Sequence, residues 1–419
     1  MFRNIATVMK GTVVGQGLGL LVLPLLTRLY DPAAFGHFQL YQSAMLVLVV
    51  FVSLRFEVAL LRAHDGRELH ATLALCILAT FAVATALSLA WAVVLVWQPE
   101  IYSRFPLPPW VVWPAVVLIG VFQFLGFLVT RHHLYGVSAV SKVSQAGSYA
   151  AIALGLGALR ASLGLIIADA LSRLIASLYL LRAVRGMGFR GLRDVTATDI
   201  RNAAYKFREF PLITVFGGLI NSAGAVLTPI MIYANFSPDV SGQFALVERA
   251  ISFPIAMVVG AISQVYMASF SDTIRSHPRQ VPLQYHSLLR NMTLVGTGPA
   301  VLGFLYAPEM FKLVFGQDWA TAGSLARLMI PAYFIIFVYG GVNMTLMLLG
   351  RQLLQTAWEI LRLVCMLVLW GLVVRPDMSV ETVVTMHAMV LGGVSLLFLI
   401  AAEYGVRKGP TEMALQHAR

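Results

Sequence analysis

The chain has 419 residues, of which 59% are hydrophobic and 12% charged, and its formal net charge is +11. With a mean hydropathy of +0.80, this composition excludes a soluble protein. The apolar runs are continuous rather than alternating, which excludes a transmembrane β-barrel and predicts an all-α integral membrane protein.

The first predicted element is a helical hairpin over residues 10–62 that crosses a membrane twice. Its first arm, 11–27, is uncharged and carries three glycines at a spacing of four, which places small residues on one helix face. The pair Asp31-Pro32 then ends one helix and starts the next. The second arm, 37–61, is apolar except for a few polar positions, and it is expected to be one continuous helix.

Further apolar stretches of about 20 residues, the length that crosses a bilayer, follow to the end of the chain. We predict about twelve transmembrane helices, at 11–27, 37–61, 72–97, 110–130, 143–159, 162–182, 210–233, 241–270, 291–307, 325–350, 353–374 and 382–402.

The longest predicted connection is the basic cytoplasmic linker 183–209, midway along the chain. It separates an N-terminal six-helix lobe, 1–182, from a C-terminal six-helix lobe, 210–402, which a cytoplasmic tail follows at 403–419. Because six is even, both lobes have the same orientation, and we predict a pseudo-twofold axis along the membrane normal. An offset of 206 residues aligns the first hairpin with a second copy, pairing Gly11 with Gly217, Pro32 with Pro238, Gly36 with Gly242 and Phe38 with Phe244.

Lysine and arginine are distributed unevenly between the two sets of loops. The loops expected on one side hold twenty of these residues and those on the other side hold six. By the positive-inside rule, both termini are cytoplasmic. Basic loops that face anionic lipid account for the net charge, so no nucleic acid partner is expected.

Three segments taken together resemble the Wzx-type polysaccharide flippases of the multidrug/oligosaccharidyl-lipid/polysaccharide exporter superfamily. They are 23–36 (LPLLTRLYDPAAFG), 250–264 (AISFPIAMVVGAISQ) and 314–323 (VFGQDWATAG). The resemblance covers nearly the whole chain and implies two six-helix lobes around a central cavity. It implies a flippase of the bacterial cytoplasmic (inner) membrane that moves an undecaprenyl-diphosphate-linked oligosaccharide, such as an O-antigen, exopolysaccharide or capsule repeat unit, from the inner to the outer leaflet. The expected partners are this lipid-linked oligosaccharide, membrane lipids, a polysaccharide polymerase and a chain-length regulator.

Two arginines within predicted spans lack an acid on their own helix face. Around Arg55 the positions three and four residues away are apolar, and Glu57 would lie about 200° around a continuous helix. Arg249 has similar surroundings, whereas Asp169 and Arg173 can neutralise each other at i, i+4. We predict that Arg55, in the inner half of the membrane, and Arg249, in the outer half, bind the diphosphate. Snorkelling and pairing across helices remain alternatives.

The remaining site predictions concern one arginine, two amides and two acids. Arg28, Gln16 and Asn221 are expected to line the same cavity, although Arg28 also suits an interfacial anchor and the two amides also suit hydrogen bonds between helices. Lipid II flippases carry an arginine on the first span, where this chain has Gln16. Glu57 and Glu248 are candidates for H⁺ or Na⁺ coupling or for bonds across helices, and the membrane potential is an alternative driving force.

The sequence indicates neither a cofactor nor a metal site. Both cysteines, Cys76 and Cys365, lie in apolar runs. The pair His132-His133 lies in a cytoplasmic loop without metal-ligand spacing to other groups, and we expect it to be solvated.

Two other functions remain open. A drug or small-cation exporter of the same superfamily would need an acidic cavity, whereas the arginines above are basic. A membrane enzyme of glycan assembly would need an acidic catalytic motif in an outer loop, but these loops hold only isolated acids such as Asp31, Glu100, Asp239 and Asp377. We therefore predict a transporter and not an enzyme.

The orientation can be tested with single cysteines in a variant that lacks Cys76 and Cys365. A cysteine at His64 or Ser276 should resist a membrane-impermeant thiol reagent in intact cells, because both positions are predicted to be cytoplasmic. A cysteine at Glu100 should react. Labelling of the first two positions from outside would reverse the predicted topology.

Overall fold

The computed structural model describes the backbone of residues 2–105, 107–187, 189–375 and 377–417. It also describes their side chains, except at 2–10, 12, 103–104, 190, 216–217, 220–221 and 408–417. Within these ranges the regular structure is helical, and no strand occurs. The chain divides into two compact units, residues 1–242 and 243–419, and each is described by itself.

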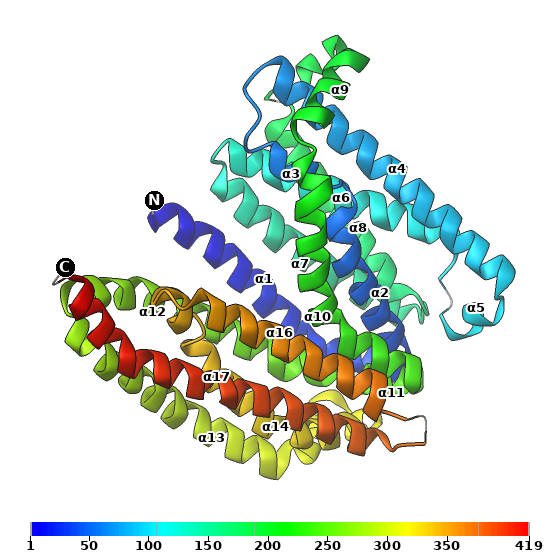
Figure 1. The fold of residues 1–419 in the computed structure, drawn as a ribbon. Helices are drawn as coiled ribbons and strands as arrows, with labels where there is room; N and C mark the ends of the chain where they lie inside the picture. The colour runs from blue at the N-terminus through cyan, green and yellow to red at the C-terminus, as the bar shows by residue number, and fades with distance from the viewer. Residues whose placement is uncertain (1, 106, 188, 376, 418–419) are drawn as a thin grey trace. The chain divides into compact units, whose positions relative to one another are not determined.

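The first unit is built around long helices. Helices α4, α6 and α8 pack in that order, and α7 packs against both α1 and α8 (Figure 1). At the start of α2 the carboxylate of Asp31 accepts a hydrogen bond from the Ala34 backbone N–H at 2.8 Å, and Pro32 occupies the first turn, as expected for a helix start. The elements are α1 (Phe2–Leu29), α2 (Pro32–Phe51), α3 (Phe56–Ala59), α4 (Arg67–Trp97), α5 (Glu100–Arg104), α6 (Pro109–Arg131), α7 (Tyr135–Ala158), α8 (Gly164–Val184), η1 (Arg190–Asp194), α9 (Ala197–Lys206), η2 (Phe210–Thr214), α10 (Val215–Asn235) and the beginning of α11 (Pro238–Val247).

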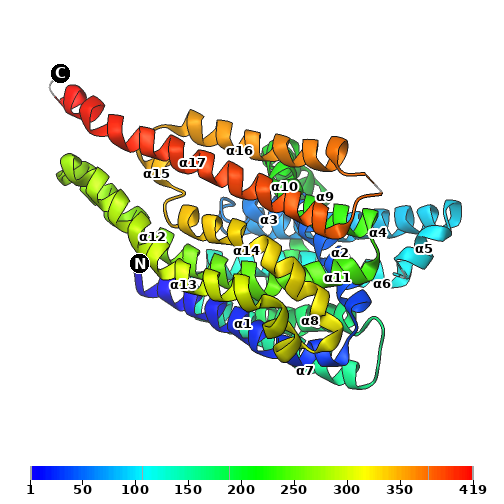
Figure 2. The same cartoon turned by 90° about the horizontal axis from the view of Figure 1, so that it is seen from below.

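In the second unit, α14 packs between α13 and α17 (Figure 2). Aromatic residues from several helices fill its core, with Trp358 and Phe398 at a ring-centroid distance of 5.0 Å. The elements are the end of α11, then η3 (Glu248–Ser252), α12 (Phe253–Ser276), η4 (Pro278–Gln280), α13 (Val281–Phe315), η5 (Gln317–Trp319), α14 (Ala320–Gly341), α15 (Thr345–Leu348), α16 (Gln352–Val368), η6 (Leu369–Val373) and α17 (Val380–His417).

The predicted spans coincide with helices. In the described part of the chain, nine helical segments are long and apolar enough to cross a membrane, and each matches one predicted span. The other predicted spans, 11–27, 143–159 and 210–233, lie in α1, in α7, and in η2 with α10. The prediction of an all-α membrane protein is confirmed.

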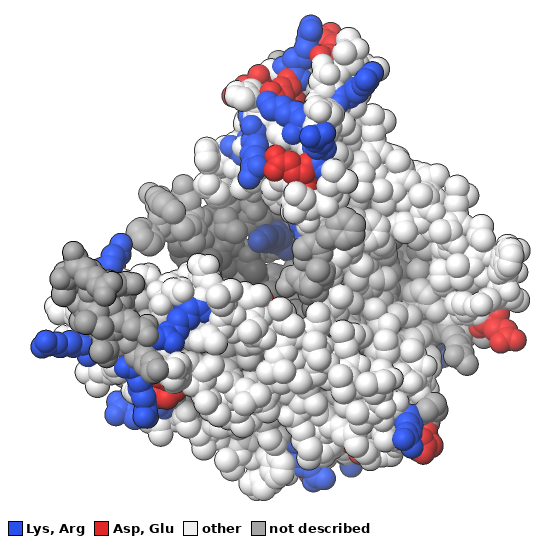
Figure 3. Space-filling view, viewed as in Figure 1, with Lys and Arg blue, Asp and Glu red and all other residues white. Residues whose placement is uncertain are grey.

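The predicted linker is folded onto the first unit. It forms η1 and α9, and Lys206 of α9 makes an ion pair with Glu68 of α4 at 2.7 Å. Phe207 and Phe210 are buried in the core with α3, α4 and α6. Figure 3 shows charged side chains gathered over the region of α9, beside the largely uncharged surface over α4.

The lobe boundaries at 183–209 stay a prediction, since the compact units divide at residue 242 and α10 packs against α2 within the first unit.

The first turns of α2 and α11 make a reciprocal contact within the first unit. A Cβ atom on Gly36 would overlap the carbonyl oxygen of Pro238, and a Cβ on Gly242 would overlap the carbonyl oxygen of Pro32. These four residues are the two pairs that the sequence repeat aligns. Only glycine permits this approach of the two backbones, because any side chain would meet backbone atoms that cannot rotate away.

Gly36→Ala should therefore lower the apparent melting temperature of the purified protein, since overpacking of this kind costs about 1–3 kcal/mol. Gly242→Ala should have a similar effect. Gly19→Ala is the matched control, because a Cβ at this helical glycine meets no atom within 4 Å. Equal melting temperatures for all three variants would show that the contact contributes nothing to stability.

Candidate functional site

Arg55 lies at a break between two helices, and not within a continuous one. Helix α2 ends at Phe51 and α3 begins at Phe56. Between them Leu54 and Arg55 adopt left-handed backbone conformations, with φ of 52° and 62°. The expectation of an unbroken helix over 37–61 is wrong here. Left-handed conformations of residues other than glycine persist only where the surroundings hold them.

The break brings Glu57 close to Arg55, which corrects the expectation that this arginine has no acid beside it. Glu57 Oε1 lies 3.8 Å from Arg55 Nη1. The expected separation of about 200° between Arg55 and Glu57 assumed a continuous helix. The left-handed residues Leu54 and Arg55 change the direction of the Arg55 side chain. The charge of Arg55 is thus partly balanced within its own segment.

Glu57 is the centre of this arrangement. Its side chain is fully buried, at 0% exposure, and accepts hydrogen bonds from the Ser53 hydroxyl and from Gln123 Nε2 of α6, the latter at 2.8 Å. These bonds fasten the start of α3 to both the end of α2 and the middle of α6. Without them, the carboxylate would carry a large desolvation cost in an apolar core.

The guanidinium of Arg55 keeps donors that Glu57 does not use. The 3.8 Å separation is too long for a hydrogen bond, and the side chain is 23% exposed. Its buried Nε has no hydrogen-bond partner among the described residues. A Cβ at Gly218 of α10 would lie 2.5 Å from Arg55 Nη2, so this small residue leaves room for the guanidinium. The guanidinium is thus charged and partly exposed, while its Nε is buried and unused.

Arg249 and Glu248 lie in η3, a π-helical segment between α11 and α12 in the second unit. Arg249 is half-buried. Glu248 accepts a hydrogen bond from the hydroxyl of Tyr333 on α14, which is the bond across helices that the sequence left as one alternative. Segments of π-helix change the direction of side chains within a helix and frequently occur at functional sites.

The other predicted residues have less defined surroundings. Gln16 and Arg28 are exposed on α1. The side chain of Asn221 lies outside the described residues. The predicted pair of Asp169 and Arg173 is confirmed at 2.9 Å, and the hydroxyl of Tyr41 also donates to Asp169 at 3.1 Å. Of the predicted cavity residues and coupling acids, the structure brings together Arg55 and Glu57, while Arg249 is adjacent to Glu248 in the second unit.

Sequence reasoning missed Ser53, Gln123 and the helix break. The cluster of Ser53, Arg55 and Glu57 within an apolar run was a signal, because three polar groups so close together in a membrane span need partners. Gln123 is a lone amide in an apolar span and carried no comparable signal.

Among the described residues no group of three histidine, cysteine or acidic side chains could hold a metal ion.

Comparisons with known proteins bear on this architecture. Residues 1–274 match the family model of polysaccharide biosynthesis proteins. The chain belongs to the polysaccharide biosynthesis protein family. This confirms the predicted resemblance to the polysaccharide branch of the superfamily. No curated protein matches the chain significantly.

Solved structures of transporters and of a flippase share the fold. The lipid II flippase MurJ, in an inward closed conformation, aligns with a TM-score of 0.66 at 9% identity, covering 99% of this chain and 91% of that one. A multidrug resistance MATE family transporter, in an inward-facing conformation, aligns with a TM-score of 0.56 at 12% identity, covering 97% and 95%. A MATE transporter in complex with MaL6 gives a TM-score of 0.53 at 13% identity, covering 99% and 97%. At these identities the likeness establishes the fold alone.

The arrangement at Glu57 predicts a graded response to substitution. Glu57→Ala should lower the melting temperature of the purified protein by several degrees, because it leaves Gln123 and Ser53 without an acceptor and removes the charge beside Arg55, at a cost of about 3 kcal/mol. Glu57→Gln should have a smaller effect, since its amide oxygen still accepts hydrogen bonds. The exposed Glu381→Ala is the control. A stability of Glu57→Ala equal to that of this control would exclude the structural role.

Proposed function

We propose that this protein is a flippase that moves an undecaprenyl-diphosphate-linked oligosaccharide from the inner to the outer leaflet of the bacterial cytoplasmic membrane. Three findings support the proposal: its family is that of polysaccharide biosynthesis proteins, its fold is shared with a lipid II flippase, and Arg55 keeps a partly exposed guanidinium that forms no hydrogen bond to the acid beside it. The third finding carries the proposal, because a charged guanidinium held within an apolar span suits an anionic ligand.

The physical task is to carry a diphosphate and many hydroxyl groups past hydrocarbon. Unaided transfer would cost tens of kcal/mol, because the charges would lose their hydration. In the proposed mechanism Arg55 captures the diphosphate in the inner half of the membrane and Arg249 receives it in the outer half, as access alternates between the two sides. The isoprenoid tail stays in the lipid. Arg28, Gln16 and Asn221 are proposed to contact the substrate in the same cavity.

The driving force needs no tightly bound ion. With the cell interior negative, outward movement of each negative charge gains about 2.3 kcal/mol per 100 mV of membrane potential. Coupling to H⁺ or Na⁺ through Glu57 or Glu248 remains a further proposal. Both carboxylates are already engaged in hydrogen bonds within their own units, which favours a structural role for each. A polymerase and a chain-length regulator are the proposed protein partners.

The drug or small-cation exporter remains the alternative, since MATE transporters share the fold. The two functions make opposite demands on the charge at position 55. A cation exporter would be hindered by a guanidinium in its pathway, whereas a diphosphate carrier requires one.

Arg55→Ala and Arg249→Ala should each reduce glycan export at least about tenfold at normal protein abundance, since a charge-assisted hydrogen bond to phosphate contributes roughly 1.5–3 kcal/mol. Arg55→Lys should retain part of the export, because it keeps the charge and loses the bidentate geometry. The measurement is glycan export in cells divided by the amount of membrane-inserted protein. Arg182→Ala, at an exposed arginine near the end of α8, is the control.

Near-normal export by both alanine variants would eliminate the arginines as substrate ligands. Reduced abundance with unchanged export per molecule would show that they act as membrane anchors or structural partners. Accumulation of lipid-linked glycan on the cytoplasmic face of a deletion strain tests the flippase assignment itself, independently of either arginine.

A further inference from the structure

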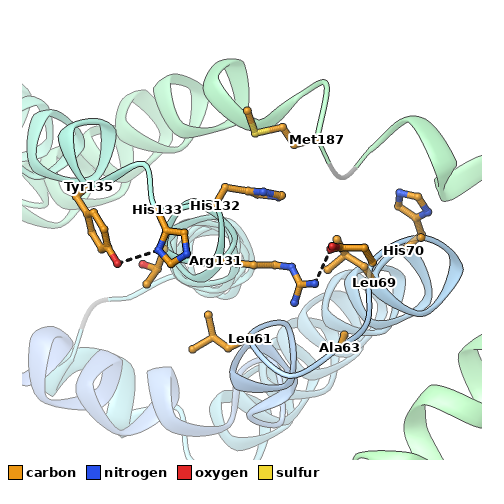
Figure 4. A pocket seen from close by; sticks show the side chains of 12 residues that line it. Leu61, Ala63, Leu69, His70, Arg131, His132, His133, Tyr135 and Met187 are labelled. Carbon is orange, nitrogen blue, oxygen red and sulfur yellow. Dashed lines mark hydrogen bonds and ion pairs between the residues drawn. The ribbon is translucent and has the colours of Figure 1, made fainter. Parts of the chain in front are cut away.

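A cavity of about 800 Å³ lies at the predicted cytoplasmic end of the first unit. It is formed by the connection from α3 to α4, by the end of α6 with the turn that follows, and by Met187 at the start of the linker. Figure 4 shows Arg131 and His132 projecting from the end of α6 toward Leu69 and His70 of α4. None of the residues that line this cavity is a substrate ligand in the function proposed above.

The described lining is rich in basic side chains. Four of its residues are Arg131 and three histidines, and its one acid is Asp65. Arg131 is 14% exposed and donates from Nη2 to Asp65 at 2.7 Å. This hydrogen bond holds the pKa of Asp65 below its ordinary value. Asp65 itself is 88% exposed, so it can turn toward water if another anion takes its place beside Arg131.

The histidine rings are held in place, and their nitrogens have only part of the hydrogen bonds that they can form. His132 Nε2 is buried and has no hydrogen-bond partner among the described residues, which is a costly state for a polar atom. His133 has a left-handed backbone, with φ of 56°, and its Nδ1 lies 3.1 Å from the hydroxyl of Tyr135. The ring of His70 packs on the backbone of η1, because a Cβ at Gly191 would overlap it. These constraints fix the rings around the cavity.

We propose that this cavity binds a phosphate group, with Arg131, His132 and His70 as its ligands. Phosphate oxygens accept hydrogen bonds on all sides, which suits guanidinium and imidazole donors that converge from two helices. A metal ion suits the cavity less well, since the described residues contain no group of three ligating side chains close enough together. The phosphate comes either from the headgroup of an anionic lipid or from a soluble compound, and both would reach a site at the membrane surface.

Occupation of the cavity acts on the segment that holds Arg55. Arg131 Nη1 donates to the carbonyl oxygen of Leu60, which caps α3, while Gln123, two turns earlier on α6, holds Glu57 at the start of the same short helix. A phosphate that draws Arg131 toward itself weakens the first of these attachments. The cavity is therefore placed to regulate the candidate site from the cytoplasmic side.

The test uses the full-length protein purified in dodecyl maltoside, a detergent without phosphate. One arm measures inorganic phosphate binding by calorimetry, and the other measures retention of phosphatidic acid by native mass spectrometry. His132→Ala should weaken binding about tenfold, as expected for the loss of one charge-assisted hydrogen bond, and His132→Gln should restore much of it because its amide keeps an N–H donor. His64→Ala is the matched control, because His64 is 82% exposed in the same connection and does not line the cavity.

The two arms distinguish the sources of phosphate. Binding of inorganic phosphate that depends on His132 indicates a soluble ligand, and His132-dependent retention of phosphatidic acid alone indicates a lipid headgroup. Equal binding by the wild type and His132→Ala in both arms, or binding in neither arm, would overturn the proposal. Because both arms measure binding to purified protein, the result does not depend on whether the protein exports glycan.

Discussion

The hydrogen bonding of one buried carboxylate, Glu57, holds together the segment on which the candidate site depends. Two consecutive left-handed residues precede it, each at a cost of order 1–3 kcal/mol, and the bonds from Ser53 and Gln123 offset that cost. The same carboxylate limits the unpaired charge of Arg55, which makes the arginine tolerable in a membrane span. Glu57 therefore determines both the backbone conformation and the charge balance of this site.

This arrangement also bears on the turnover of the proposed transporter. A site that bound a diphosphate with a fully unpaired arginine would release it slowly. At 3.8 Å, Glu57 attracts Arg55 without forming a hydrogen bond, so it would compete with a diphosphate bound as proposed and lower its affinity. A binding site that must empty on the other side of the membrane benefits from such a competitor. The acid beside Arg55 is thus compatible with anion transport.

The sequence predicted the helical membrane fold well, because apolar runs of sufficient length have few alternatives in a bilayer. It also predicted the start of α2 from Asp31-Pro32 and the pairing of Asp169 with Arg173, since both depend on residues close together in sequence. It failed at residues 52–55, where a uniform helix was assumed and partners from α6 decide the conformation. His133 is exposed, as expected for a solvated side chain, whereas His132 is half-buried, and the fold places both on the wall of a cavity with His70.

The reciprocal contact between the first turns of α2 and α11 has the form of an isologous interface in a twofold homodimer, in which each partner offers the same patch to the other. Gly36 meets Pro238 as Gly242 meets Pro32. In a twofold homodimer, one glycine and one proline would serve both halves of such a contact. In this chain four separate positions form the contact, so each half can mutate separately while the fit between the two halves constrains both.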